Sequence, residues 1–442
     1  MASKKSVIAV VLGLTLTTTT GATDLVTVYQ QAAEYDSELA AAFAGFKAQE
    51  ERVDEAQSTL LPQIGAAATL QRTRYLGDPG FDIESSFTSK GWGISLVQPL
   101  FRADRWYRFQ GSKYASERAQ AEFAQEQQEL ILRTAEAYFS VLRTKEALTT
   151  SLAAEEAFER QWQQAVQRHK VGLTAVTEVH ESRALYDAAK VQRIALEGEV
   201  DLALENLERL TGKTYPELAS LSEQFPVFRP VPNEPDAWVE TALKQNWAIQ
   251  TAFHGVQVAQ EQAKAARALH YPTLDATASY NRSSSSSSGP GVDRFGQNYT
   301  AFGVELTVPL YAGGGIDAGV RRARYELEQA EQVLTTIRRN VTLNTRSLFR
   351  AINTNIESIS ARKQAIVSAE SALSATRAGY KVGTRNVVEV LDAERLYYET
   401  LRDYTNDRFN YVLNSLRLKQ AAGTLSPEDL MQLNRWLARS EG

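Results

Sequence analysis

Apolar and polar positions alternate with a period of two in four short segments of the chain, residues 64–71, 92–97, 274–281 and 301–308. In the second segment, for example, Trp, Ile and Leu share one face of the predicted strand, and Gly, Ser and Val share the other. Each segment approaches the roughly 10-residue length of a strand that crosses a membrane between lipid and water. A small soluble sheet with one buried face has the same period, so periodicity alone leaves both interpretations open.

The segments around these strands have the composition of long helices. Residues 24–60 contain no proline and are rich in Ala, Glu and Gln, which predicts one helix that ends before Pro62. Residues 100–215 and 310–426 also lack proline. A single helix over residues 101–168 would extend roughly 100 Å, so it must lie beside other long helices and bury an apolar stripe. Candidates for that stripe are Ala135, Tyr138, Phe139 and Leu142.

The order helix, strand, loop, strand, long helix, turn, helix occurs twice. Sequence landmarks recur at a spacing of 210 or 211 residues, and the clearest are Leu61-Pro62-Gln63-Ile64 with Tyr271-Pro272-Thr273-Leu274, Gln98-Pro99-Leu100-Phe101 with Val308-Pro309-Leu310-Tyr311, and Lys170-Val171-Gly172 with Lys381-Val382-Gly383. We therefore predict a first structural repeat over 23–215, a proline-rich connector over 216–235 and a second repeat over 236–442. The polar segments 76–88 and 283–298 are predicted loops between the strands of each half.

Residues 1–22 have the features of a signal peptide. Lys4 and Lys5 precede the apolar run 7–16, and the small residues Thr20-Gly21-Ala22 follow it, which predicts cleavage after Ala22. The apolar run is much shorter than the roughly 20 residues of a spanning helix. No later stretch has 18 apolar residues in a row, so a membrane-embedded part of the mature chain would have to be a closed β-barrel. Membrane barrels begin at about eight strands, so several chains must contribute, and both a dimer and a trimer would suffice.

Composition and charge exclude several classes of function. Removing the two signal-peptide lysines from the 48 basic residues leaves 46 against 53 acidic ones, a formal charge of about −7. That balance argues against nucleic acid as a partner, because such binding needs a basic surface. The chain has no cysteine, which excludes disulfides, thiolate metal sites and a lipid on an N-terminal cysteine.

No cofactor, metal or catalytic site is predicted. The glycines of 313–315 lie between a strand and a helix, as in a dinucleotide-binding turn, but the helix that follows has some 65 residues and no short return to a parallel strand. His169 and His180 flank one turn, without a nearby cysteine and without counterparts in the second half. We therefore do not expect an enzyme.

With these features in view, the chain resembles the TolC family of outer-membrane efflux and secretion channels over nearly its whole mature length. The segments that carry the resemblance are the turns 171–179 and 382–393 and the strings Arg408-Phe409-Asn410-Tyr411 and Gly423-Thr424-Leu425. The resemblance implies an α+β membrane protein that forms a homotrimer. A twelve-stranded barrel would lie in the outer membrane of a Gram-negative bacterium, in contact with outer-membrane lipid. A twelve-helix tube would continue from it into the periplasm.

The resemblance also implies partners and a transport function. In the family, a periplasmic adaptor, or membrane fusion protein, and an inner-membrane efflux pump or ABC transporter act with the channel. The tube then exports drugs, small toxic molecules or type I secreted proteins, and its helical tip opens like an iris. The sequence does not indicate which of these substrates, or which pump, this chain serves.

The turns between the long helices are the predicted adaptor-contact sites. Gly172 and Gly383 occupy the position at which a helix ending needs a left-handed residue, as in any helical hairpin. The resemblance adds that adaptor helices pack on these two turns. The candidate contacts are Val171, Gly172, Leu173, Val176, Val382, Gly383 and Val387.

Two acidic residues, Glu389 and Asp392, lie three positions apart in the first turns of a predicted helix, so they share one face. An acidic first turn is also a common helix-capping preference. The resemblance implies that the pair forms two rings of carboxylates inside the constricted tip, which would favour cations. The family pattern has aspartate at the position of Glu389, so the longer side chain here would narrow or soften that ring.

The resemblance further implies a gate held shut by polar links between neighbouring helix pairs. It maps this latch onto Arg385, Tyr380, Thr177 and Glu178. A guanidinium donates several hydrogen bonds in a fixed fork and therefore suits a latch better than an ammonium group.

Two other classes of protein remain as alternatives, a periplasmic coiled-coil scaffold or adaptor and a secreted enzyme. An adaptor would have one central hairpin flanked by compact β modules, whereas this chain has two predicted hairpins and two strand pairs. The four amphipathic strands therefore favour the channel.

Overall fold

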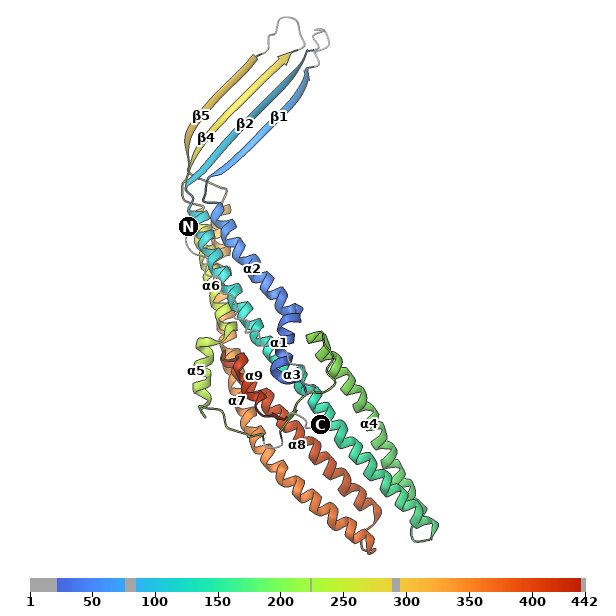
Figure 1. The fold of residues 1–442 in the computed structure, drawn as a ribbon. Helices are drawn as coiled ribbons and strands as arrows, with labels where there is room; N and C mark the ends of the chain where they lie inside the picture. Colours follow the sequence, from blue (N-terminus) through green and yellow to red (C-terminus); the bar gives the residue numbers. More distant parts are fainter. Residues whose placement is uncertain (1–21, 76–84, 223–224, 288–294, 439–442) are drawn as a thin grey trace.

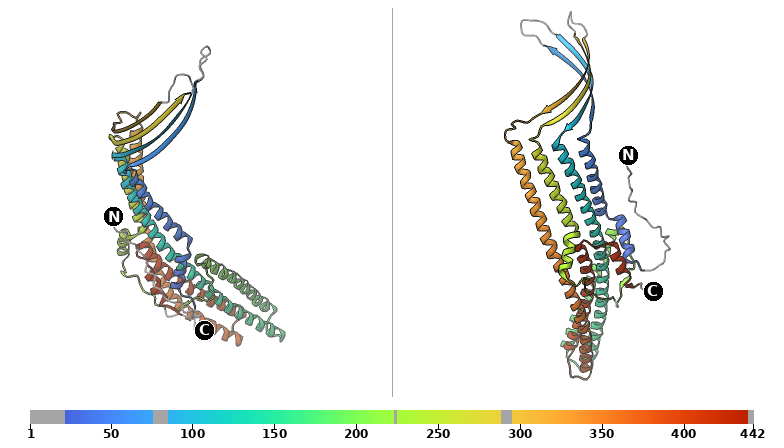
Figure 2. Two further views of the ribbon diagram at one scale, coloured as in Figure 1. Left: turned by 45° about the horizontal axis from the view of Figure 1, so that its top comes forward. Right: turned by 90° about the vertical axis from the view of Figure 1, so that its left-hand side faces the viewer.

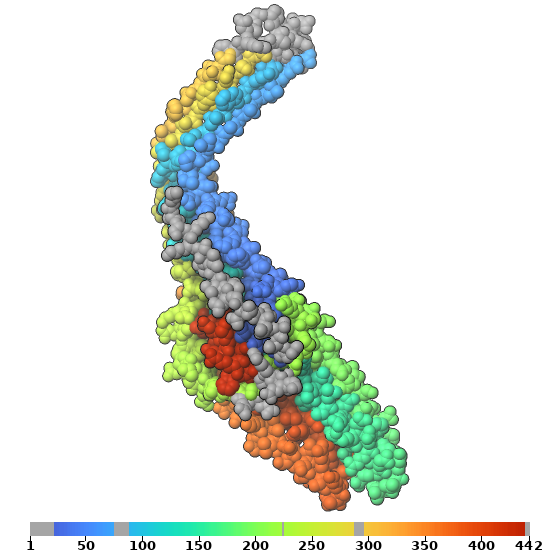
Figure 3. All heavy atoms as spheres, in the orientation of Figure 1, coloured from blue at the N-terminus to red at the C-terminus, as the bar shows by residue number. Residues whose placement is uncertain are grey.

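The computed structural model describes residues 22–75, 85–222, 225–287 and 295–438. Apart from Ala22, the predicted signal peptide lies outside these residues. The subunit is long and narrow, with a β-sheet at one end and helices along the rest of its length (Figures 1 and 3).

The helices and strands follow one another in an order that occurs twice. A pair of short helices leads into a strand pair, then into a very long helix and a shorter one. The elements are α1 Leu25–Tyr35, α2 Ser37–Ser58, β1 Gln63–Tyr75, β2 Ser85–Phe101, α3 Ala103–Lys170, α4 Val176–Thr211, β3 Ser220–Leu221, α5 Pro235–Gln245, α6 Trp247–Ala268, β4 Thr273–Ser287, β5 Phe295–Thr307, α7 Gly315–Lys381, α8 Val387–Ala422, α9 Pro427–Asn434 and β6 Leu437–Ala438.

The long helices are confirmed. Helix α3 has 68 residues and α7 has 67, so each extends about 100 Å at 1.5 Å per residue. Below the sheet, α2 packs on α3, α3 on α6 and α6 on α7, and the four helices lie side by side (Figure 2). The apolar stripe predicted for α3 is buried at all four positions, Ala135, Tyr138, Phe139 and Leu142. No helix in the described part of the chain is long and apolar enough to cross a membrane.

The single helix predicted over residues 24–60 is wrong, because the chain forms two helices there. Asp36 adopts an extended backbone conformation between α1 and α2, and its carboxylate accepts a hydrogen bond from the Leu39 amide at 2.6 Å. Asn246 forms the same kind of break between α5 and α6, with its side chain 3.2 Å from the Ile249 amide. A short polar side chain that caps the following helix outweighs the helical preference of its neighbours.

The four long strands form one antiparallel sheet in the order β1-β2-β4-β5. The strands are longer than predicted, and the predicted loops are correspondingly shorter. Residues 283–287, expected in a loop, are the last residues of β4 and pair with residues 87–91 of β2. Residues 85–88 and 295–298, also expected in loops, are the first residues of β2 and β5, and residues 76–84 and 288–294 lie outside the described residues. Within the described chain, the outer edges of β1 and β5 pair with no other strand.

The register separates apolar from polar residues. Ile64 of β1 lies beside Leu96 of β2, Leu96 beside Ala278 of β4, and Ala278 beside Phe302 of β5. Even-numbered residues of the four strands therefore share one face, here called the apolar face. Odd-numbered residues are mostly small or polar and form the polar face. Ile64 and Phe302 are 72% and 83% exposed, so the subunit leaves its apolar face uncovered.

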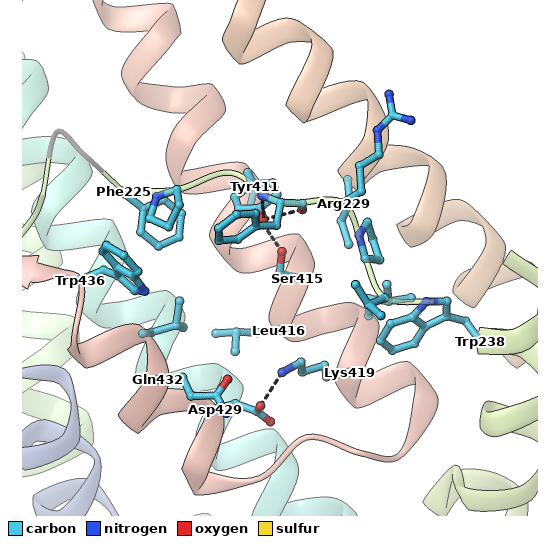
Figure 4. Close-up of a pocket in the computed structure, with 17 residues that line it drawn as sticks. Phe225, Arg229, Trp238, Tyr411, Ser415, Leu416, Lys419, Asp429, Gln432 and Trp436 are labelled. Carbon is cyan, nitrogen blue, oxygen red and sulfur yellow. Dashed lines mark hydrogen bonds and ion pairs between the residues drawn. The ribbon is translucent and has the colours of Figure 1, made fainter. Parts of the chain in front are cut away.

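The main hydrophobic core lies midway along the helices, where α1, α3, α4, α7, α8 and α9 meet the connector. The Tyr138 hydroxyl donates to the Ala219 carbonyl at 2.7 Å, and the Tyr411 hydroxyl donates to the Phe228 carbonyl at 2.8 Å. A cavity of about 420 Å³ lies between the connector, α8 and α9, with the Lys419–Asp429 ion pair on its wall (Figure 4). The short β3–β6 pairing, which the sequence did not indicate, ties the last described residues to this core.

Gly423 provides a test of this packing. It ends α8 with a φ of 77°, and an added Cβ would lie 2.3 Å from the Gln245 carbonyl oxygen at the end of α5. We expect Gly423→Ala to lower the free energy of unfolding by more than the roughly 1–2 kcal/mol of a left-handed alanine alone, because the backbone of α5 must also shift.

The matched control is Gly198→Ala in α4, where an added Cβ meets no atom within 4 Å. This change should stabilise the helix by about 0.5–1 kcal/mol. Thermal melts in detergent, followed by far-ultraviolet circular dichroism, compare the two variants. Equal melting temperatures for both would contradict the packing described here.

Candidate gate at the helical tip

The two helical hairpins of the chain lie side by side at the end farthest from the sheet (Figure 1). Gly172 and Gly383 have φ angles of 75° and 82°, so the predicted left-handed endings are confirmed. In each turn, an amide closes back onto the last turn of the long helix: Leu173 donates to the Arg168 carbonyl and Thr384 to the Gly379 carbonyl, both at 2.9 Å. The turns therefore satisfy carbonyls that the helix ends would leave unpaired.

A small apolar cluster holds the two hairpins together just above the turns. This tip core consists of Ala154, Phe158, Tyr380, Val387, Val390 and Leu391, which come from α3, α7 and α8. Val387 is completely buried in it. Val387, predicted to contact an adaptor, packs inward at the start of α8, so its side chain does not lie on the surface of the turn.

The remaining predicted contact residues lie on the surface of the turns. Val382 and Val171 are 76% and 69% exposed, and Leu173 and Val176 are also exposed. Val388, one position beyond the buried valine, is exposed as well. Both turns thus present exposed apolar side chains beside a glycine.

Two of the four predicted latch residues are in contact. The Tyr380 hydroxyl lies 3.5 Å from the Glu178 carboxylate, at the edge of hydrogen-bonding distance, and this contact links α7 to α4. The Arg168 guanidinium lies 4.7 Å from the centre of the Tyr380 ring, a cation–π contact that the sequence did not indicate. Burial raises the pKa of Tyr380, so its hydroxyl remains a donor. Thr177 is exposed.

Arg385 does not reach the other hairpin within the subunit. It forms an ion pair with Glu389, one helical turn further along α8. Glu389 also completes a capping box, since its amide donates to the Asn386 side chain at 2.9 Å and its carboxylate accepts from the Asn386 amide. The Arg385 guanidinium and the Asn386 amide together hold the pKa of Glu389 below its usual value. Arg385, which was predicted for the latch, and Glu389, which was predicted for the acidic ring, therefore form an ion pair with each other.

Asp392, the second predicted ring residue, is also paired. Arg395 lies 2.9 Å from its carboxylate, and both side chains are more than half exposed. Each of the two acidic positions therefore carries a guanidinium beside it. These guanidinium groups reduce the negative electrostatic potential around Glu389 and Asp392. Because both pairs are exposed to solvent, each is weak.

A buried carboxylate that the sequence analysis missed lies behind the acidic pair. Glu394 is 1% exposed, and Arg377 of α7 donates to its Oε1 at 2.7 and 3.0 Å. Its Oε2 has no hydrogen-bond partner, and desolvation raises the pKa of Glu394. The spacing 387, 390, 391, 394 is a buried helical stripe, and this pattern could have revealed the residue.

A family comparison matches this chain in two stretches. The model of the outer membrane efflux protein family matches residues 28–213 and 238–424. The outer membrane protein TolC of Escherichia coli is 37% identical over 98% of this chain and 90% of its own length. The alkaline protease secretion protein AprF of Pseudomonas aeruginosa is 27% identical over 91% of this chain and 85% of its own length.

The fold is shared with solved outer-membrane channels. The CmeC outer membrane channel of Campylobacter jejuni superposes with a TM-score of 0.78 over 93% of this chain and 89% of its own, at 16% identity. At that identity the likeness concerns the fold, whereas the family follows from the sequence matches. The chain belongs to the outer membrane efflux protein family.

Proposed function

We propose that three copies of this chain form one continuous channel, a twelve-stranded barrel in the outer membrane that continues as a twelve-helix tube in the periplasm. The outer-membrane location and the role as an efflux or secretion channel follow from the family. The observation that carries the trimer proposal is the open sheet, with two unpaired long edges and one uncovered apolar face.

Pairing between subunits removes both defects of the open sheet. An unpaired edge exposes a row of N–H and C=O groups, which in lipid must find partners. Joining β5 of one copy to β1 of the next pairs every edge and turns the apolar face toward lipid. Three copies give twelve strands, and the side-by-side helices α2, α3, α6 and α7 give twelve helices below them. Eight strands from a dimer would also close, and the resemblance to the TolC family favours three.

The repeated order of elements supports the proposal that residues 23–215 and 236–442 are structural repeats joined by the connector 216–235. Six similar hairpins would then surround the tube. The exposed apolar residues Val171, Leu173, Val176, Val382 and Val388 are the proposed contacts for a periplasmic adaptor, which would link the channel to an inner-membrane efflux pump or ABC transporter. The cargo would be drugs, small toxic molecules or secreted proteins, passed outward without chemical change.

The trimer is tested on protein extracted from the outer membrane in mild detergent. We expect a species with three times the mass of the mature chain by native mass spectrometry, which falls apart on heating and conducts ions in planar bilayers. A freely soluble periplasmic monomer would refute the channel.

The latch is tested by removing its polar groups while keeping its packing. Tyr380→Phe retains the buried ring and loses the hydroxyl that meets Glu178, and Arg385→Gln removes the charge beside Glu389. We expect the double variant to raise single-channel conductance severalfold. Each link contributes only about 0–1 kcal/mol, but three copies act together.

The control for the latch is Arg322→Gln, which removes an exposed guanidinium from an ion pair of the same i,i+4 spacing near the start of α7. Its conductance should equal that of the unchanged protein. In the latch, Arg385 would link its helix pair to a neighbouring one, so unchanged conductance in the double variant would eliminate the latch assignment.

The acidic ring is tested with two changes of opposite expected sign. Glu389→Gln with Asp392→Asn should weaken block of the channel by a trivalent cation by about tenfold, equivalent to about 1.4 kcal/mol. Arg395→Gln should strengthen the block, because it frees the Asp392 carboxylate. The measurement is the blocking concentration in planar bilayers with the cation added on the tip side. If neither variant changes that concentration, the pair does not face the pore.

A further inference from the structure

Three cations lie together on the apolar face of the sheet, at its end away from the helices. They are Arg72 of β1, Lys90 of β2 and Arg282 of β4, and Arg74 of β1 lies on the same face one row beyond Arg72. We infer that these side chains bind the phosphate groups of an anionic lipid in the outer leaflet of the membrane. This inference rests on the proposed function, because it requires the apolar face to meet lipid.

The strand register places the three cations on adjacent rows of one face. Lys90 lies between Leu70 and Ser284, and Arg282 lies beside Trp92 on the next row toward the helices. Arg72 lies beside Thr88, one row beyond Lys90. All three residue numbers are even, so their side chains project from the same face as Ile64 and Phe302. The cations therefore form a patch that spans three neighbouring strands.

The patch begins where the apolar band of the sheet ends. A register shift between Pro99 and Phe101 places Phe101 beside Leu274 on the apolar face. From Phe101 to Trp92 the residues of this face are predominantly apolar, over about ten positions of β2. At about 3.3 Å per residue and a tilt of about 40°, this length covers about 25 Å of membrane thickness. That value is the height of the lipid-facing band in outer-membrane barrels, so the cations lie at its outer boundary.

An aromatic pair marks the same boundary. The rings of Trp92 and Tyr280 are 5.4 Å apart; Trp92 shares a row with Arg282, and Tyr280 lies one row nearer the helices. Trp and Tyr are enriched at membrane–water interfaces, because each has an apolar body and a polar tip. The position of this pair independently places Arg72, Lys90 and Arg282 at the level of the headgroups.

The patch has no acidic partner within the sheet. The acidic residues in the described parts of β1, β2, β4 and β5 are Asp275 and Glu305, and both lie on the polar face near the helices. Asp275 is itself paired there with Arg102. All three cations of the patch are exposed. Three unneutralised cations beside an apolar band form a site complementary to a lipid that carries phosphate.

The side chains suit this ligand. Arginine binds phosphate through two parallel hydrogen bonds, and lysine adds a compact charge. Their long aliphatic stems can lie along the apolar face while the charged groups reach the headgroup layer. At this end of the sheet β1 and β4 end and β2 and β5 begin, and the helices lie at the other end (Figure 1). With the helices in the periplasm, the patch faces the outer leaflet.

The test compares lipid binding by the full-length trimer and two charge-matched variants. Arg72→Gln, Lys90→Gln and Arg282→Gln together remove the patch, whereas Arg338→Gln, Arg339→Gln and Lys363→Gln together remove three exposed cations from helix α7. The probes are lipid A and lipid A stripped of its phosphates, titrated in detergent and counted on the trimer by native mass spectrometry. We expect the unchanged protein and the α7 variant to bind lipid A equally and the patch variant to bind it about tenfold more weakly.

Two results would overturn the inference. One is equal binding of lipid A by the patch variant and the unchanged protein; the other is equal binding of both lipid forms by the unchanged protein, which would mean that the contact is apolar. If the triple variant fails to assemble, the single variants Lys90→Gln and Arg282→Gln replace it, and each should bind more weakly than the unchanged protein. Conductance separates the two proposals, because an unchanged trimer that conducts but does not prefer phosphorylated lipid refutes only the lipid site.

Discussion

The arrangement of this molecule depends on how its four long strands satisfy their backbone hydrogen bonds. Within the described chain, β1 and β5 end the sheet with unpaired edges, and its even-numbered face is apolar and uncovered. Neither property is stable in a membrane for a single subunit, since lipid supplies no hydrogen bonds. The same constraint applies to the helices. Because α2, α3, α6 and α7 continue directly from the four strands, any ring that closes the sheet also sets the helices side by side in a ring.

At the opposite end, the subunit is held by side chains rather than by backbone pairing. The tip core, the Tyr380–Glu178 contact and the Glu394–Arg377 ion pair join the helices there. These contacts involve few residues. The Tyr380–Glu178 contact is at the edge of hydrogen-bonding distance, whereas the buried Glu394 carboxylate depends on Arg377 for its partner. The chain thus combines a sheet held by continuous backbone pairing with a tip held by a small number of side-chain contacts.

The element order and the chemistry of the turns were predictable because they depend on local rules. Proline-free segments predicted α3 and α7, and the glycines at 172 and 383 predicted left-handed helix endings. The break at Asp36 was missed because a single capping side chain is a weak signal inside a strongly helical composition. The length of β4 was missed because serine favours loops on its own, and only pairing with β2 makes residues 283–287 a strand.

For the gate, the sequence alone determined which residue types gather near the turns, since spacing on a helix sets which side chains share a face. Tertiary structure decided which of them meet. Val387 is buried and Val388 exposed because α8 packs against α3 and α7 with one particular rotation. Glu394 pairs with Arg377 because packing brings α7 and α8 together, whereas the Arg385–Glu389 pair follows from a local spacing of four residues. The sequence pattern determines the period of a helix or strand. The elements packed against it decide in which direction its apolar face points.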